Sequence, residues 1–254
     1  LVFLLSGNIL PLVCTPLALV GYFDDKFNLK ATTRYLVQFI TSILILLVTN
    51  NFRFNSIYEL LFTIFLIIAG TGIINIINFM DGIDGLVIST FIIILIPFAL
   101  IESNYFFILI SSLLAFLFFN WEPAKIFMGD IGSTYLGAIF FGILLSFNKN
   151  SYSLMNLAIA SPLLLDGIIC ILRRYINGEN IFKSHNKHIY QRLFQAGLKH
   201  SQISIIYSTL TFILLIIFFL KIYQLMILGI LGSIIFGVYL EKYICIPFNN
   251  KTLK

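Results

Sequence analysis

Asn78, Asp81 and Asp84 carry oxygen-bearing side chains at intervals of three residues, with Gly82 and Gly85 beside them. On a helical turn this spacing puts the three side chains roughly on one stripe, and the glycines let a backbone or a ligand approach closely. Oxygen donors without cysteine or an adjacent histidine suit a hard cation such as Mg²⁺. The alternative is an ordinary glycine-rich turn.

Two further acidic blocks lie far from this one in the sequence. Residues 128–133 read Met-Gly-Asp-Ile-Gly-Ser, where Asp130 opens an apolar helix whose free N–H groups suit a phosphate. Asp130 then suits the cation that accompanies the phosphate, and a plain helix cap would need no such glycines. Asp24 and Asp25 end the first apolar run, and adjacent acids repel one another unless a cation lies nearby. They are candidates for a metal or proton-transfer site, or for a solvated pair that caps the next helix.

A basic segment follows residue 172. Its charged and imidazole side chains are Arg173, Arg174, Lys183, His185, Lys187, His188, Arg192 and Lys199. Such a run can bind anionic lipid, and two histidines without cysteine or a neighbouring acid are a weak zinc signature. It can also clamp a diphosphate that Mg²⁺ already bridges. We expect Asp166 to orient this segment by pairing with Arg173 or Arg174.

The elements that position these groups are membrane helices. The 254 residues are 59% hydrophobic and 11% charged, with a mean hydropathy of +1.00, which is typical of polytopic membrane proteins. A span needs roughly 20 apolar residues. The sequence predicts an all-α integral membrane protein of about nine spans in a single domain, 1–254. The apolar runs are 8–22, 32–49, 57–77, 86–101, 105–120, 132–147, 153–171, 203–220 and 223–243.

Basic residues fix the expected orientation, because Lys and Arg accumulate in cytoplasmic loops. With nine spans, all sixteen Lys and Arg except Arg53, Lys149 and Lys221 fall on one side. That side also holds every motif described above. The predicted site therefore faces the cytoplasm.

The ends of the chain and its cysteines add two expectations. The first apolar run has no small-residue cleavage site, and the chain begins with Leu1 rather than Met, so we expect sequence upstream of it. Cys14, Cys170 and Cys245 lie within or beside apolar runs and form no metal-type spacing. They are predicted to be inert buried thiols.

Four motifs together resemble a known superfamily. They are Asp24-Asp25, the run from Asn78 to Leu86, the run from Phe127 to Ser133, and the stretch from His185 to Arg192. In order, sidedness and spacing they resemble the polyprenyl-phosphate N-acetylhexosamine-1-phosphate transferases, which include the peptidoglycan translocase MraY and the WecA-type enzymes. The resemblance covers nearly the whole chain.

The resemblance implies a reaction at the cytoplasmic face of the bacterial inner membrane. A UDP-N-acetylamino sugar would donate its sugar 1-phosphate to undecaprenyl phosphate, giving a lipid-linked diphosphate sugar and UMP. Membrane lipid is an implied partner, nucleic acid is not, and a homodimer is left open. By likeness the Mg²⁺ ligands are Asn78 and Asp130, the catalytic carboxylates are Asp24, Asp25, Asp81 and Asp84, and the substrate-binding residues are Arg34, Lys183, His185, His188 and Arg192.

The histidine motif bears on the donor. MraY-like members carry consecutive histidines, whereas this chain reads His185-Asn-Lys-His188-Ile-Tyr-Gln-Arg192. That form is closer to the enzymes that begin O-antigen lipopolysaccharide and other surface glycans. It favours an N-acetylhexosamine donor, with the muramoyl-pentapeptide donor as the alternative.

Two other classes of protein stay open. A polytopic transporter with an intramembrane cation site also carries buried acids, although these usually lie near the midplane and repeat in the two halves. A non-catalytic membrane scaffold explains neither the glycine-flanked acids nor the histidines.

Overall fold

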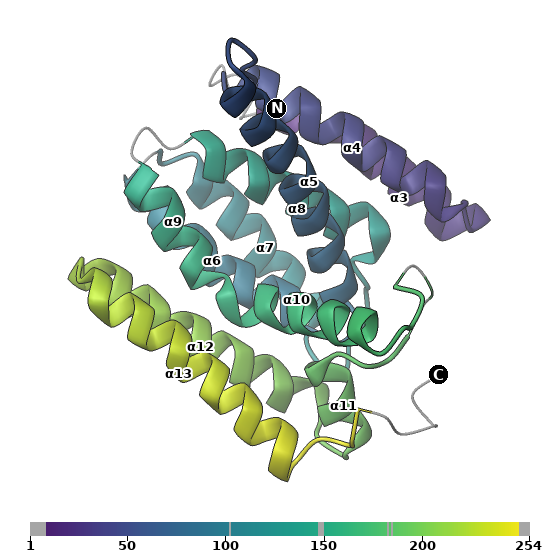
Figure 1. Cartoon of the computed structure of the whole chain (residues 1–254). Helices are drawn as coiled ribbons and strands as arrows, with labels where there is room; N and C mark the ends of the chain where they lie inside the picture. Colours follow the sequence, from purple (N-terminus) through teal and green to yellow (C-terminus); the bar gives the residue numbers. More distant parts are fainter. Residues whose placement is uncertain (1–8, 102, 147–149, 182, 184, 249–254) are drawn as a thin grey trace. The chain divides into compact units, whose positions relative to one another are not determined.

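The structure is a computed structural model that describes residues 9–101, 103–146, 150–181, 183 and 185–248, without the side chains of 150–153. Within this part of the chain every regular element is a helix (Figure 1), which confirms the all-α prediction. Asn8, Phe147, Lys149, Lys251 and Lys254, which the predictions used, lie outside it. The helices are α2 (Leu10–Val13), α3 (Thr15–Phe27), α4 (Ala31–Val48), α5 (Ile57–Met80), α6 (Leu86–Ile101), α7 (Phe106–Asn120), α8 (Gly129–Ser146), α9 (Asn150–Ile159), α10 (Ser161–Ile176), α11 (Ile189–Gln195), α12 (His200–Leu220) and α13 (Tyr223–Tyr243).

Five of these helices are long and apolar enough to cross a membrane: α4, α5, α8, α12 and α13. Helices α6 and α7 are apolar but shorter. Many large apolar side chains on the candidate spans are exposed, as expected where lipid covers them. The protein is a membrane protein.

The chain forms two compact units, one of residues 1–81 with 128–153 and the other of residues 82–127 with 154–254. Each is described by itself below. The prediction that residues 1–254 form a single domain stays a prediction.

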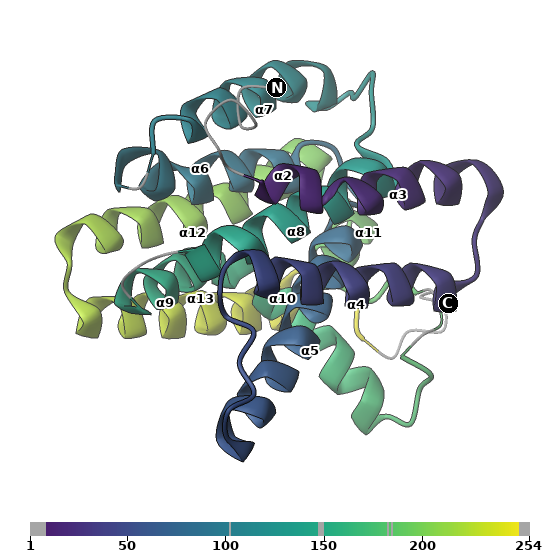
Figure 2. The same ribbon diagram turned by 90° about the horizontal axis from the view of Figure 1, so that it is seen from above.

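In the first unit, α8 packs against α3 and α5, while α4 packs against α3 and α5. Figures 1 and 2 both show α3 and α4 running side by side. Glycine allows the close contacts on α8, because a Cβ built on Gly21 of α3 would lie 2.5 Å from the backbone nitrogen of Ile131. A Cβ on Gly137 of α8 would lie 2.9 Å from Cα of Ile74. The end of α3 is thereby held against the beginning of α8.

In the second unit, α12 packs against α6 and α13, and α6 packs against α7. Figure 2 shows α12 and α13 side by side. Helix α10 contacts α11, α12 and α13, and the short α11 lies within the basic segment. The unit thus surrounds the start of α11 with three longer helices.

The first acidic motif is only partly helical. Helix α5 ends at Met80, so Asn78 lies on its last turn, while Asp81 and Asp84 belong to the turn that follows. Gly85 ends this turn with φ +74°. The expected stripe along one helix is therefore wrong beyond Asn78, because α5 ends at Met80 and the chain then turns before α6 begins at Leu86.

Candidate active site

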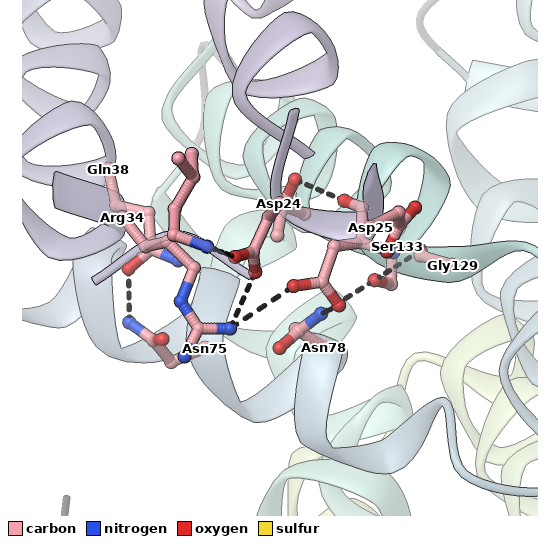
Figure 3. Close-up of polar contacts among 11 residues, drawn as sticks. Asp24, Asp25, Arg34, Gln38, Asn75, Asn78, Gly129 and Ser133 are labelled. Atoms are coloured by element: carbon pink, nitrogen blue, oxygen red, sulfur yellow. Dashed lines mark hydrogen bonds and ion pairs between the residues drawn. The ribbon is translucent and has the colours of Figure 1, made fainter. Parts of the chain in front are cut away.

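The first unit brings together two acids from separate helices around one arginine on a third. Nη1 of Arg34, on α4, lies 2.8 Å from Oδ2 of Asp24 and 3.3 Å from Oδ2 of Asp130 (Figure 3). Asp24 is on the last turn of α3, and Asp130 is on the first turn of α8. One guanidinium therefore bridges two carboxylates that are distant in sequence.

Asp24 is held by the end of its own helix. Asn28 closes α3 in the left-handed conformation with φ +50°, and its N–H donates to the carbonyl of Asp24 at 2.8 Å. The next N–H, of Leu29, donates to Oδ1 of Asp24 at 2.7 Å. Both carboxylate oxygens thus have partners, and the side chain of Asp24 is buried.

Asp25 contacts the beginning of α8. Its Oδ1 accepts the N–H of Asp130 at 3.2 Å (Figure 3). Gly129 has φ +62°, and a Cβ there would lie 2.6 Å from Oδ2 of Asp25. A side chain at residue 129 would be strained and would displace the carboxylate, which is a physical reason for the glycine before Asp130.

Asn78 orients Asp130. Its amide nitrogen donates to Oδ1 of Asp130 at 2.8 Å and to Oγ of Ser133 at 2.9 Å (Figure 3). Ser133 in turn donates to the carbonyl of Gly129 at 2.8 Å. As a cation ligand, Asn78 would have to present its amide oxygen, so that role stays a prediction.

The charges of this cluster favour a bound cation. Asp81, at the end of α5, has its pKa raised well above the usual range by burial, and the negative charges of Asp130 and Asp25 raise it further. Carboxylates that repel one another in this way are stabilised by a divalent ion among them. Oxygen donors without thiol or imidazole suit Mg²⁺, so the residues of the first unit fit that ion.

A cavity with several polar side chains in its lining extends from the acids between α3, α4, α5 and α8. Its lining includes Asp24, Arg34, Asn78 and Asp130 together with Gln38 and Asn75. Asn75 donates to Oε1 of Gln38 at 2.5 Å (Figure 3). The sequence predictions did not include these two amides. In the sequence, the only indication that Gln38 and Asn75 belong to a site is that each is an uncharged polar residue inside an apolar run. Such a residue is a weaker indication of a functional site than an acid in the same position.

Asp84 lies in the second unit with a partner that the predictions also missed. Oδ1 of Asp84 is 3.2 Å from Nδ1 of His200, the first residue of α12, and Oδ2 accepts the N–H of Ala124 at 3.1 Å. The neighbouring Gly85 N–H donates to Asn120 at 2.9 Å. His200 is the third histidine of the chain, and its position at the start of an apolar run was the available signal.

Asp166 does not pair with Arg173 or Arg174, so that prediction is wrong. Its Oδ1 lies 3.6 Å from Nδ1 of His188 and accepts the N–H of Ile189 at 2.8 Å. Its Oδ2 accepts the hydroxyl of Tyr207 at 2.6 Å. Asp166 is buried inside the unit, whereas both arginines lie on the last turn of α10 and reach other acids.

These other acids hold the basic segment together. Arg173 pairs with Glu241, and Nη2 of Arg192 lies 2.8 Å from the same carboxylate. Arg174 pairs with Glu179 at 3.2 Å, and Lys187 pairs with it at 2.6 Å. The sequence did not predict these pairs, because each joins residues whose contact depends on how the helices and the loop pack.

The expected substrate-binding residues of the second unit fall into two groups, one buried and one with exposed surface. Arg192 is 1% exposed and His188 is 2% exposed, while Lys183 is exposed and His185 is partly exposed. Burial would lower the pKa of His188, but the neighbouring Asp166 carboxylate raises it to about 10. Burial, and then the charge of His188, lower the pKa of His185 to about 3. At neutral pH the first ring is therefore cationic and the second is neutral.

Comparison with known proteins adds to this geometry. A family model described as glycosyl transferase family 4 matches residues 9–148. A probable undecaprenyl-phosphate N-acetylglucosaminyl 1-phosphate transferase of Bacillus subtilis is 33% identical over 204 residues, covering 71% of this chain and 56% of the relative. A phospho-N-acetylmuramoyl-pentapeptide-transferase of Fervidobacterium nodosum is 30% identical over 211 residues, covering 74% and 67%.

A third relative acts on another polyprenyl carrier by its name. The decaprenyl-phosphate N-acetylglucosaminephosphotransferase of Mycobacterium leprae is 28% identical over 230 residues, covering 72% of this chain and 56% of the relative. The matches thus span between 56% and 67% of the length of these three curated relatives.

Proposed function

Because the chain belongs to glycosyl transferase family 4, we propose that it transfers a sugar 1-phosphate from a UDP-N-acetylamino sugar to undecaprenyl phosphate. The products are a polyprenyl-diphosphate sugar and UMP. The observation that carries this proposal is the cluster of Asp24, Asp25, Asp81 and Asp130 around Arg34, with Asn78 fixing Asp130. We also propose that residues 1–254 form a single transferase domain.

Phosphoryl transfer needs alignment and charge neutralisation more than covalent help. Asp130 holds Mg²⁺, with Asn78 as its orienting partner or second ligand. When bound, the ion neutralises charge on the phosphate oxygens that Asp81 and Asp25 would otherwise repel. Arg34 contacts the phosphate of lipid or donor from the α4 side, because its guanidinium is partly exposed beside Asp24.

Asp24 and Asp25 stand beside the attacking lipid phosphate. Both oxygens of Asp24 already accept hydrogen bonds, from Leu29 and Arg34, so acting as a general base requires that it release Arg34. An anionic lipid phosphate needs no base to attack. Asp24 therefore acts chiefly by positioning Arg34 and Asp130.

The second unit supplies the donor-binding residues. Asp84 lines the nucleotide and diphosphate pocket, and His200 fixes its orientation. Lys183 and His185 contact the donor directly, because both retain exposed surface. His188 and Arg192 are buried and hold the segment in place for them.

The relatives leave two donors to be distinguished. Bacillus and Mycobacterium relatives carry N-acetylglucosamine in their names, whereas the Fervidobacterium relative is named for the muramoyl-pentapeptide donor. Separated histidines in the sequence 185–188 favour the first donor and a role in starting a surface glycan such as lipopolysaccharide. The relatives named here are transferases, and none supports the transporter alternative.

Nine spans, a cytoplasmic site and the bacterial inner membrane complete the proposal. The five long helices and the shorter apolar α6 and α7 support seven of these spans, and α3 and α10 overlap the apolar runs that predict the other two. The distribution of Lys and Arg supports the orientation. Gly137 and Gly142 pack against Ile74 and Leu10 of the same chain, so they do not support a homodimer.

The test is an assay of purified full-length chain in detergent with undecaprenyl phosphate and Mg²⁺. UDP-N-acetylglucosamine, other UDP-N-acetylhexosamines and UDP-muramoyl-pentapeptide are supplied separately, and UMP and lipid-linked product are measured. We expect product from one of the hexosamines, its loss with EDTA, and at least about 10²-fold slower turnover in Asp130→Asn.

Glu59→Gln is the matched control, because Glu59 is a carboxylate of the same unit that caps the start of α5 and does not line the cavity. It should keep normal turnover. Product from the muramoyl donor alone would select the alternative branch. An Asp130→Asn protein as active as the unchanged one would contradict the site.

A further inference from the structure

A second cluster of metal-binding side chains lies within the second unit. Sγ of Cys170 and one ring nitrogen each from His185 and His188 all lie within 4.8 Å of one another. Cys170 and His188 are buried, and His185 is partly exposed. Cys170 comes from α10, while the histidines lie on the loop before α11, so packing joins residues that have no metal-type spacing in the sequence.

The donor set differs from that of the first unit. One thiol and two imidazoles suit Zn²⁺ and similar thiophilic ions, whereas Mg²⁺ prefers oxygen. With Zn–S near 2.3 Å and Zn–N near 2.0–2.1 Å, one sulfur and two nitrogens in a tetrahedral site lie roughly 3.3–3.6 Å apart. Starting from separations of at most 4.8 Å, the three atoms would need to approach one another by about 1 Å, through small rotations of the Cys170 and histidine side chains.

A carboxylate already supports one of the histidines. Oδ1 of Asp166 lies 3.6 Å from Nδ1 of His188, so in the proposed site the metal would bind the opposite nitrogen of the ring, Nε2. Asp166 is itself fixed by the hydroxyl of Tyr207 at 2.6 Å and by the N–H groups of Ile189 and Tyr190 at 2.8 and 3.2 Å. Metal-ligating histidines usually donate their other N–H to such a carboxylate.

The two nearby cations share one acidic partner. Arg174 pairs with Glu179 and donates to the carbonyls of Asn180 and Lys183, and Lys187 pairs with the same Glu179. A bound dication would face the Cys170 thiolate and, behind His188, the Asp166 carboxylate. Two negative charges then balance the ion, which lowers the penalty of placing it in a buried position.

We propose that Cys170, His185 and His188 form a site for a thiophilic metal ion such as Zn²⁺, with Asp166 supporting His188. The thiol proton of Cys170 and the Nε2 proton of the cationic His188 ring both leave to solvent as the metal–sulfur and metal–nitrogen bonds form. Three protein ligands leave one coordination position for water at the exposed side of His185. The bound ion links the loop before α11 to α10. If the proposed function holds, a bound ion also makes His185 unavailable for contact with the donor.

The experiment measures metal binding and does not depend on turnover. Purified full-length chain in detergent competes for Zn²⁺ with a chromophoric chelator in excess Mg²⁺, and Co²⁺ is then substituted to record the sulfur-to-cobalt absorption band. We expect one Zn²⁺ per chain and a clear band. Cys170→Ser should abolish the band and the tight site, and Asp166→Asn should weaken Zn²⁺ binding about 10–100-fold.

Cys14→Ser and Cys245→Ser are the matched controls, one in the other unit and one whose Sγ lies 3.9 Å from the carbonyl of Ile189. Both should bind Zn²⁺ normally. Because Asp166→Asn could disturb folding, His185→Ala at the partly exposed ligand is a second variant and should also weaken binding. Equal Zn²⁺ binding by Cys170→Ser, or a cobalt spectrum without the sulfur band, would overturn the site.

The same titration on Asp130→Asn separates the two proposals. Zn²⁺ binding that survives in this variant shows the second-unit site to be independent of the transferase site. Metal binding without transferase activity in the unchanged chain would count against the proposed function alone.

Discussion

Replacing Gly21 with alanine should separate the acids of the first unit. A Cβ at residue 21 would lie 2.5 Å from the backbone nitrogen of Ile131 and 2.6 Å from the carbonyl carbon of Asp130. Both atoms belong to the main chain of α8, so neither can rotate away. Restoring a normal contact near 3.5 Å requires α3 and α8 to move apart by about 1 Å.

Asp24 and Asp25 lie one turn beyond Gly21 and would move with α3. The N–H of Asp130 would lose its 3.2 Å bond to Asp25, and Arg34 would no longer reach both of its acids. A displacement of about 1 Å at a catalytic site can cost about 10²-fold in rate. The overpacking itself should cost about 1–3 kcal/mol of stability.

The assay compares turnover and thermal stability of Gly21→Ala with those of Gly72→Ala. Gly72 lies within α5 of the same unit, and a Cβ there meets nothing within 4 Å. Alanine at residue 72 should leave turnover unchanged and stabilise the helix by up to ~1 kcal/mol. Near-normal turnover in Gly21→Ala, or an equal loss in both variants, would refute the argument that helix contact sets the acid geometry.

Two further predictions concern the second unit. Tyr207→Phe removes the 2.6 Å hydrogen bond to the buried Asp166 and should lower the free energy of unfolding by about 1.5–3 kcal/mol. Thermal unfolding in detergent measures the change. An unchanged unfolding midpoint would show that Asp166 does not depend on Tyr207. The hydrogen bond from Lys187, and then that from Arg174, hold the pKa of Glu179 below its usual value of 4.5. The two pairs therefore contribute their full stability above pH 4.5, and this stability is lost as the pH falls through the lowered pKa of Glu179. Amide exchange of residues 177–188, corrected for its intrinsic pH dependence, should therefore rise on acidification in the unchanged chain but not in Glu179→Gln.

The sequence determined what depends on local properties of the chain. The free energy of transferring apolar residues from water into lipid is a sum over each segment, so hydropathy alone indicated membrane helices. Glycines beside Asp130 and after Asp84 marked the turns that present these acids, and both take positive φ in the structure. The same motifs, read together, indicated the family.

Tertiary structure decided which of these residues meet. Arg34 was one basic residue among sixteen in the sequence, and its bridge between Asp24 and Asp130 follows from α3, α4 and α8 packing together. The partner of Asp166 was predicted wrongly, because sequence distance favoured Arg173 while burial favoured His188 and Tyr207.

Cys170 is the clearest example of a contact that the sequence could not predict. Among three cysteines in apolar runs it had no distinguishing signal, and only packing of α10 against the loop before α11 sets it beside His185 and His188. Residue type and short spacing fix which groups can do chemistry, because backbone conformation is largely a local property. Which groups act together depends on contacts between helices, and those are set by the free energy of the packed whole.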